Sequence, residues 1–86
     1  MSLPTYTEAG WTGTFTREQY PGALANGTKA RKAGSLPGDA HQDGALCTVL
    51  GSIGHKDMPG PIYFVEWSDM PRVACAITWD RLEVGS

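Results

Sequence analysis

The chain has 86 residues, of which 41 % are hydrophobic and 19 % charged, and its formal net charge is −2. These values are typical of one small globular domain and exclude a disordered chain. The slight negative charge excludes a general attraction to nucleic acid or anionic membrane. No stretch approaches the ~20 apolar residues that span a bilayer, and residues 1–11 lack the regions of a signal peptide. We therefore expect a cytoplasmic protein without a membrane partner, in which both cysteines are reduced thiols.

Residues 1–25 lack the alternating pattern of the rest of the chain and are interpreted as an N-terminal arm. "TREQ" at 16–19 has the spacing of a helix capping box, which predicts one helical turn ended by "YPG" at 20–22. The arm also contains Trp11 and Phe15, whose large apolar side chains need a surface to pack against.

From residue 26 onward, short apolar runs alternate with turn residues. The pattern predicts five strands, over residues 27–34, 45–53, 62–67, 72–78 and 79–84, the last entered through a turn. A long polar loop follows the first strand, and a tight hairpin joins the third to the fourth. This layout favours an all-β fold, a five-stranded SH3-like barrel over residues 26–84 that follows the arm.

Both faces of the predicted third strand, "IYFVEW" at 62–67, are apolar. The two-residue period directs Tyr63, Val65 and Trp67 to the barrel interior. The opposite face of the sheet is formed by Leu46, Leu50, Ile62, Phe64, Ala74 and Ala76. Each large side chain left in water there would forgo about 1.5–3 kcal/mol. We therefore expect this face to be covered by the arm or by another subunit, as the contact surface of a homo-oligomer.

Residues 57–67 and 69–79 both begin with Asp-Met-Pro and end with tryptophan. Since successive strands run antiparallel, each end of the barrel would bring one Met near one Trp, a favourable contact. The pairs would be Met58 with Trp79 and Met70 with Trp67. Local packing explains this pattern, and a ligand or partner platform is the functional alternative.

Asp39, His41 and Asp43 alternate in the long loop and would share one side if the loop were extended. Such a set could bind a divalent cation, and His55 with Asp57 could complete it. Asp and Gly are also the usual residues of an exposed turn. The turn interpretation is the one we adopt, and no metal site is predicted.

Cys47 and Cys75 fall at inward positions between apolar residues, where a thiol behaves as a small hydrophobic group. Neither histidine has an evident third group to orient it for nucleophilic catalysis. The chain also lacks a nucleophile elbow and a phosphate-binding glycine loop. We therefore predict no catalytic residues and no cofactor.

Lys29, Arg31 and Lys32 form the one basic cluster of the chain. Small barrels bind nucleic acid through a basic strand with exposed aromatic residues. Lysines on an edge strand also prevent edge-to-edge pairing. A nucleic-acid site at these three residues is an alternative that the acidic loops disfavour.

"GTKARKAG" (27–34), "YFVEW" (63–67) and "VACAITWDRLE" (73–83) resemble the SH3-like barrel of the plasmid-borne, trimethoprim-resistant type II dihydrofolate reductases. In that family four copies surround a pore, where a Val-Gln-Ile-Tyr run binds folate and the nicotinamide cofactor. The corresponding segment here, "VACA" (73–76), keeps Val73 and lacks the Gln and Tyr, while Lys32 falls where the family has a basic residue. The resemblance implies a self-associating bacterial barrel of a mobile gene cassette or integron, without reductase activity.

The sequence therefore favours a non-enzymatic binding or interaction module that forms a homo-oligomer with an unidentified small molecule or protein as its partner. One alternative is an oligomer with a small-molecule pocket at the subunit interface. The other is a nucleic-acid-binding barrel.

Overall fold

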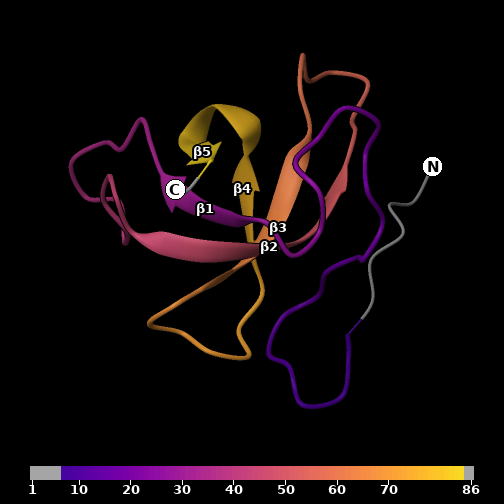
Figure 1. Ribbon diagram of the computed structural model, residues 1–86, viewed down its shortest axis with the longest axis horizontal. Coiled ribbons are helices and arrows are strands. Elements are labelled where there is room, and N and C mark those ends of the chain that lie inside the picture. The colour runs from indigo at the N-terminus through magenta and orange to yellow at the C-terminus, as the bar shows by residue number, and fades with distance from the viewer. Residues whose placement is uncertain (1–6, 85–86) are drawn as a thin grey trace.

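A computed structural model describes residues 7–84 as one antiparallel sheet of five strands, in the order β4-β3-β2-β1-β5 (Figure 1). The strands are β1 (Lys29–Lys32), β2 (Leu46–Ile53), β3 (Ile62–Trp67), β4 (Cys75–Thr78) and β5 (Leu82–Val84), with a 3-10 turn, η1 (Trp79–Arg81), before β5. The all-β prediction is confirmed, and each strand lies within its predicted segment. The sheet is open, with β4 and β5 at its two edges. Within residues 7–84 no helix is long and apolar enough to cross a membrane.

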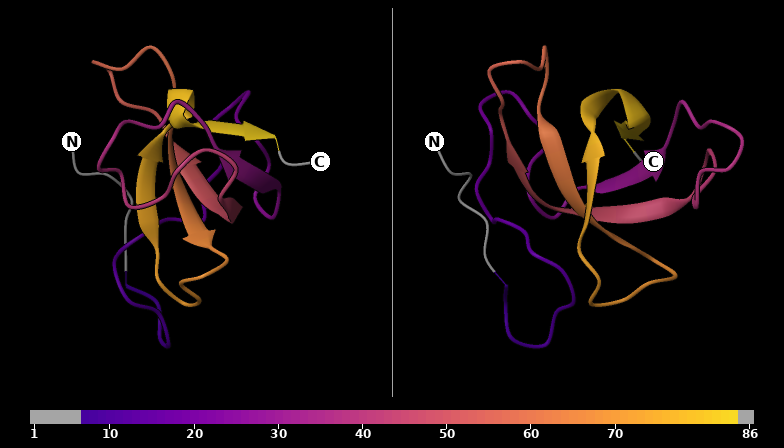
Figure 2. Two further views of the ribbon diagram at one scale, coloured as in Figure 1. Left: turned by 90° about the vertical axis from the view of Figure 1, so that its left-hand side faces the viewer. Right: turned by 180° about the vertical axis from the view of Figure 1, so that it is seen from behind.

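The long strand β2 bends the sheet. Its first half pairs with both β1 and β3, and its second half pairs with β3 alone. A register shift between Val49 and Gly51 marks a bulge at the centre of the strand. Because a bulge increases the local twist, we attribute to it part of the strong curl of the sheet that Figure 2 shows.

Tyr63, Val65 and Trp67, which the alternation assigns to the interior, are buried in a first core. Its buried members are Ala30, Cys47, Val49, Tyr63, Val65 and Trp67, and Cys75, Ile77 and Leu82 pack against them at lower burial. These residues come from all five strands, so the core holds the sheet in its curled form.

The opposite face of the sheet is covered by the N-terminal arm of the same chain. Phe15 is completely buried and packs with Leu50, Ile53 and Phe64 in a second core, with Trp11 partly buried beside them. One segment thus supplies the apolar layer that this side of the sheet requires.

Backbone hydrogen bonds attach the arm at two distant points. Near β4, the Thr12 N–H donates to the Arg72 carbonyl at 2.8 Å and the Ala74 N–H donates to the Thr12 carbonyl at 2.9 Å, which makes a parallel bridge. At the end of β2, the Ser52 N–H donates to the Glu18 carbonyl at 2.7 Å. The arm therefore crosses the whole face as an extended strap.

Gly51 allows the arm to lie directly on β2. The carbonyl oxygen of Thr16 occupies the place where a side chain at position 51 would begin. The Thr16 hydroxyl accepts a hydrogen bond from the Glu18 N–H at 3.1 Å. The predicted helical turn at 16–19 is therefore wrong, because an extended backbone is needed to span the face and pair with Ser52.

Phe15→Ala should lower the free energy of unfolding by about 3–5 kcal/mol, because it removes the centre of the second core and leaves a cavity. The exposed neighbour Thr14 supplies the matched control, and Thr14→Ala should change stability by less than about 0.5 kcal/mol. Urea unfolding followed by circular dichroism measures both. Equal effects of the two substitutions would contradict the role assigned to Phe15.

Candidate functional site

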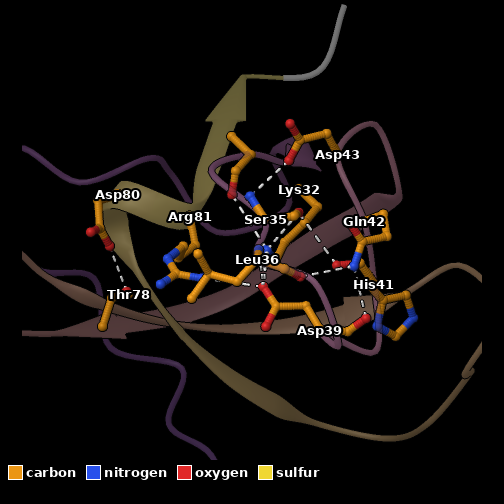
Figure 3. A network of polar contacts seen from close by, with 11 residues as sticks. Lys32, Ser35, Leu36, Asp39, His41, Gln42, Asp43, Thr78, Asp80 and Arg81 are labelled. Atoms are coloured by element: carbon orange, nitrogen blue, oxygen red, sulfur yellow. Dashed lines mark hydrogen bonds and ion pairs between the residues drawn. The ribbon is translucent and has the colours of Figure 1, made fainter.

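Asp39 is the centre of a polar network that holds the long loop between β1 and β2 (Figure 3). Its Oδ2 accepts hydrogen bonds from the Leu36 N–H at 3.0 Å and from Lys32 Nζ and Arg81 Nη1, each at 3.2 Å. The Leu36 N–H, followed by the Lys32 ammonium, lowers the pKa of Asp39 below its ordinary value. One carboxylate thus joins the loop to β1 and to η1.

Lys32 is buried although it is charged, with 5 % of its surface exposed. Its Nζ also donates to Ser35 Oγ at 2.8 Å, and the Ser35 N–H donates to Asp43 Oδ1 at 2.9 Å. The hydrogen bonds from Ser35 lower the pKa of Asp43. Burying an ammonium group without partners costs free energy, and the long loop supplies the partners that offset this cost for Lys32.

His41 packs flat on Trp67, with ring centroids 4.2 Å apart and planes inclined by 10°. Its Nε2 lies 2.9 Å from Asp69 Oδ1, in the hairpin that follows β3. The imidazole therefore closes the loop over one end of the first core. Sequence reasoning missed this stack, because the two rings belong to segments 26 positions apart and no local pattern joins them.

The three alternating loop residues considered as metal ligands are directed at different partners. Asp39 faces Lys32 and Arg81, Asp43 faces the backbone of Ser35, and His41 faces another loop. Within residues 7–84 no group of three or more His, Cys, Asp or Glu side chains is arranged to hold a metal ion.

The basic cluster is divided between environments. Lys29 is exposed, and its Nζ donates to Thr48 Oγ1 at 2.8 Å. Arg31 lies opposite Glu83 in the β1–β5 register, and Lys32 is buried. The three cations therefore do not present one continuous basic surface.

The residues proposed as a Met–Trp platform also lie in different settings. Trp67 is buried in the first core, and the half-buried Met70 and Trp79 pack against that core. Met58 is half-buried and is not a member of that core. The Trp79 ring lies directly against Gly60, where no side chain would fit. Trp79 also lines a groove.

This groove lies between η1, the start of β3 and the end of the arm. It has a volume of about 310 Å³ and is lined by Gly22, Leu24, Pro61, Tyr63, Trp79, Leu82, Glu83 and Val84. The Leu24 N–H donates to the Tyr63 hydroxyl at 2.9 Å, which fixes one wall. We call it the Trp79 groove.

The predicted contact surface is split by the arm. Leu50 and Phe64 lie beneath Phe15, while Leu46 is 48 % exposed near the start of β2. Ile62 and Ala74 are half-buried and pack against the second core, whereas Ala76, on the edge strand β4, is exposed. A shallow hollow of about 440 Å³ adjoins that edge, lined by Ile62, Ala76, Ile77, Thr78 and Arg81.

Both cysteines are free thiols. Burial raises the pKa of Cys47 to about 11, and it also raises the pKa of the half-buried Cys75. A thiol is nucleophilic as the thiolate, so these shifts make both side chains poor nucleophiles at neutral pH.

Comparison with known proteins found no matching family model, no matching curated protein and no matching solved structure.

Asp39→Asn should lower the free energy of unfolding near neutral pH, because Lys32 and Arg81 lose their shared carboxylate. The folded-state pKa of Asp39 lies below its ordinary value of 3.8. Its contribution is therefore present above that value and is lost as the pH falls through the lowered pKa. The stability difference between wild type and variant, measured by urea unfolding, should shrink as the solution is acidified.

The control is Asp57→Asn, which removes the same charge from an exposed position in the loop before β3. It should cost less stability at neutral pH than Asp39→Asn. A constant difference between wild type and Asp39→Asn at every pH would show that the carboxylate charge does not hold the loop.

A thiol reagent at pH 8 should modify Cys75 before Cys47, because Cys47 is 2 % exposed and has a pKa of about 11. About 0.1 % of such a thiol is ionised at that pH. Time-resolved labelling with mass spectrometry distinguishes the two sites. Cys75→Ser should abolish labelling of the folded protein, and urea should restore it. Rapid labelling of that folded variant would contradict the burial of Cys47.

Proposed function

We propose that this protein is a non-enzymatic binding module, built as an SH3-like barrel with an N-terminal strap, that takes an extended apolar peptide segment in the Trp79 groove. The groove is the single observation that carries the proposal. It gathers aromatic, aliphatic and proline side chains at the surface, the composition that binding sites commonly have.

The walls of the groove are held in place before any ligand arrives. The Trp79 ring packs against the backbone at Gly60. The backbone N–H of Trp79 donates a hydrogen bond to the Pro61 carbonyl at 3.1 Å. Tyr63 is anchored in the first core and through its hydroxyl to Leu24. A preformed site loses less entropy on binding, which supports recognition by a domain of this size.

The groove suits a peptide because the groove is open to solvent and its lining is mostly apolar. Its volume of about 310 Å³ accommodates one or two side chains rather than a complete cofactor. Glu83 is the one charged residue of the lining, so the geometry favours neutral or cationic segments over acidic ones.

The contacts of the polar residues in the long loop indicate that these residues stabilise the loop rather than bind a ligand. Asp39, Asp43 and Lys32 bind one another or the loop backbone. Since Lys32 is directed into this network, the nucleic-acid alternative loses one of its three cations. We therefore place the binding surface at the groove.

Val84→Asp should weaken peptide binding at least about tenfold, because it introduces a carboxylate into an apolar lining. Val84 is 61 % exposed, so the fold should tolerate the change. Phage-displayed random decapeptides selected on the wild-type protein supply the probe, and calorimetry with one selected peptide gives the affinities.

Leu46→Asp is the matched control, since Leu46 is 48 % exposed and does not line the groove. It should leave the affinity for the selected peptide unchanged. Failure to select any peptide, or equal losses for the two variants, would reject the Trp79 groove as the site.

A further inference from the structure

The turn η1 connects the polar network of the long loop to the Trp79 groove. Arg81, its last residue, is directed at Asp39 of the loop (Figure 3), and Arg81 Nη1 donates to Asp39 Oδ2 at 3.2 Å. Trp79, its first residue, and Leu82, which follows it, both line the groove. The same short turn therefore belongs to the polar network and to a wall of the proposed binding site.

The turn is closed by its own hydrogen bonds. The Leu82 N–H donates to the Trp79 carbonyl, and the Thr78 hydroxyl donates to Asp80 Oδ1 at 2.6 Å. Because one residue separates Trp79 from Arg81 within a single 3-10 turn, the two ends of the turn are displaced together. A contact that holds Arg81 therefore also holds the wall of the groove.

The long loop contacts η1 at its start and again at Asp39. At its start, the Ala33 N–H donates to the Arg81 carbonyl at 2.8 Å. A Cβ at Gly34 would lie 3.1 Å from the Asp80 carbonyl oxygen, and the φ of 59° at this position favours glycine. Asp39 lies farther along the chain, so its contact with Arg81 depends on how the rest of the loop is folded.

We propose that Asp39 and Arg81 are positioning residues for the Trp79 groove, so that the folded long loop controls how tightly the groove holds a peptide. This inference rests on the proposed function, because it concerns the same site. The Asp39 carboxylate is oriented by Lys32 Nζ at 3.2 Å and by the Leu36 N–H at 3.0 Å. When the loop opens, Arg81 loses this acceptor and η1 gains freedom that binding must remove, which weakens the complex.

Coupling between two sites acts in both directions. A peptide that fixes Trp79 also fixes Arg81, and it thereby favours the folded loop in which the Leu36 N–H donates to Asp39. Leu36 is not one of the residues that line the groove. Its amide should therefore exchange hydrogen more slowly in the peptide complex than in the free protein, and this difference should be lost in Arg81→Gln.

Calorimetry with one phage-selected decapeptide tests the link between Asp39 and Arg81. Asp39→Asn and Arg81→Gln should each weaken binding about fivefold or more. Since both changes remove the same contact, the double variant should lose about as much as either single variant. Asp43→Asn is the matched control, because it removes a carboxylate of the same loop that binds Ser35, and its affinity should stay within about twofold of wild type.

A second measurement needs no peptide. The indole N–H signal of Trp79 in the ¹⁵N NMR spectrum, assigned with Trp79→Phe, should shift more in Asp39→Asn than in Asp43→Asn. Circular dichroism checks that each variant is folded. If no peptide is selected, the proposed function fails and the Trp79 signal alone decides the link. An unchanged Trp79 signal in Asp39→Asn, additive losses in the double variant, or an equal loss for Asp43→Asn would overturn the inference.

Discussion

A sheet with apolar side chains on both faces needs cover on both sides, and the second cover here is one segment of the same chain. Phe15 has no exposed surface and is the centre of the second core. The arm can reach that place because β2 offers a glycine under the Thr16 carbonyl. The strap, the bulge in β2 and the second core therefore form one structural unit.

The long loop between β1 and β2 is held in place by polar groups, as the arm is held by apolar ones. Lys32 is buried at the end of β1, and Asp39 returns to it from within the loop. Asp39 also binds Arg81 of η1, so the loop that follows the first strand fixes the turn that precedes the last one. Since Trp79 begins that turn, the charged network on one side of the molecule helps to position a wall of the groove.

Much of the fold could be predicted because the strands are short, alternate regularly and are separated by clear turns. In "IYFVEW" the two-residue period groups Tyr63, Val65 and Trp67 on one face, and all three are buried in the first core. The path of the arm could not be predicted, because Phe15 contacts residues far along the chain and shares no period with them. The groove was missed for the same reason: Leu24, Pro61 and Val84 become neighbours only in the folded sheet.

The strap also imposes an order on protein synthesis. Phe15 leaves the ribosome before Phe64, its partner in the second core, has been translated. At about 5–20 residues per second, the delay is roughly 3–10 s, during which the aromatic side chains of the arm have no native surface to cover. The segment that is made early is thus among the last to be buried, and the nascent chain depends on rapid completion of β3 and β4 to protect it.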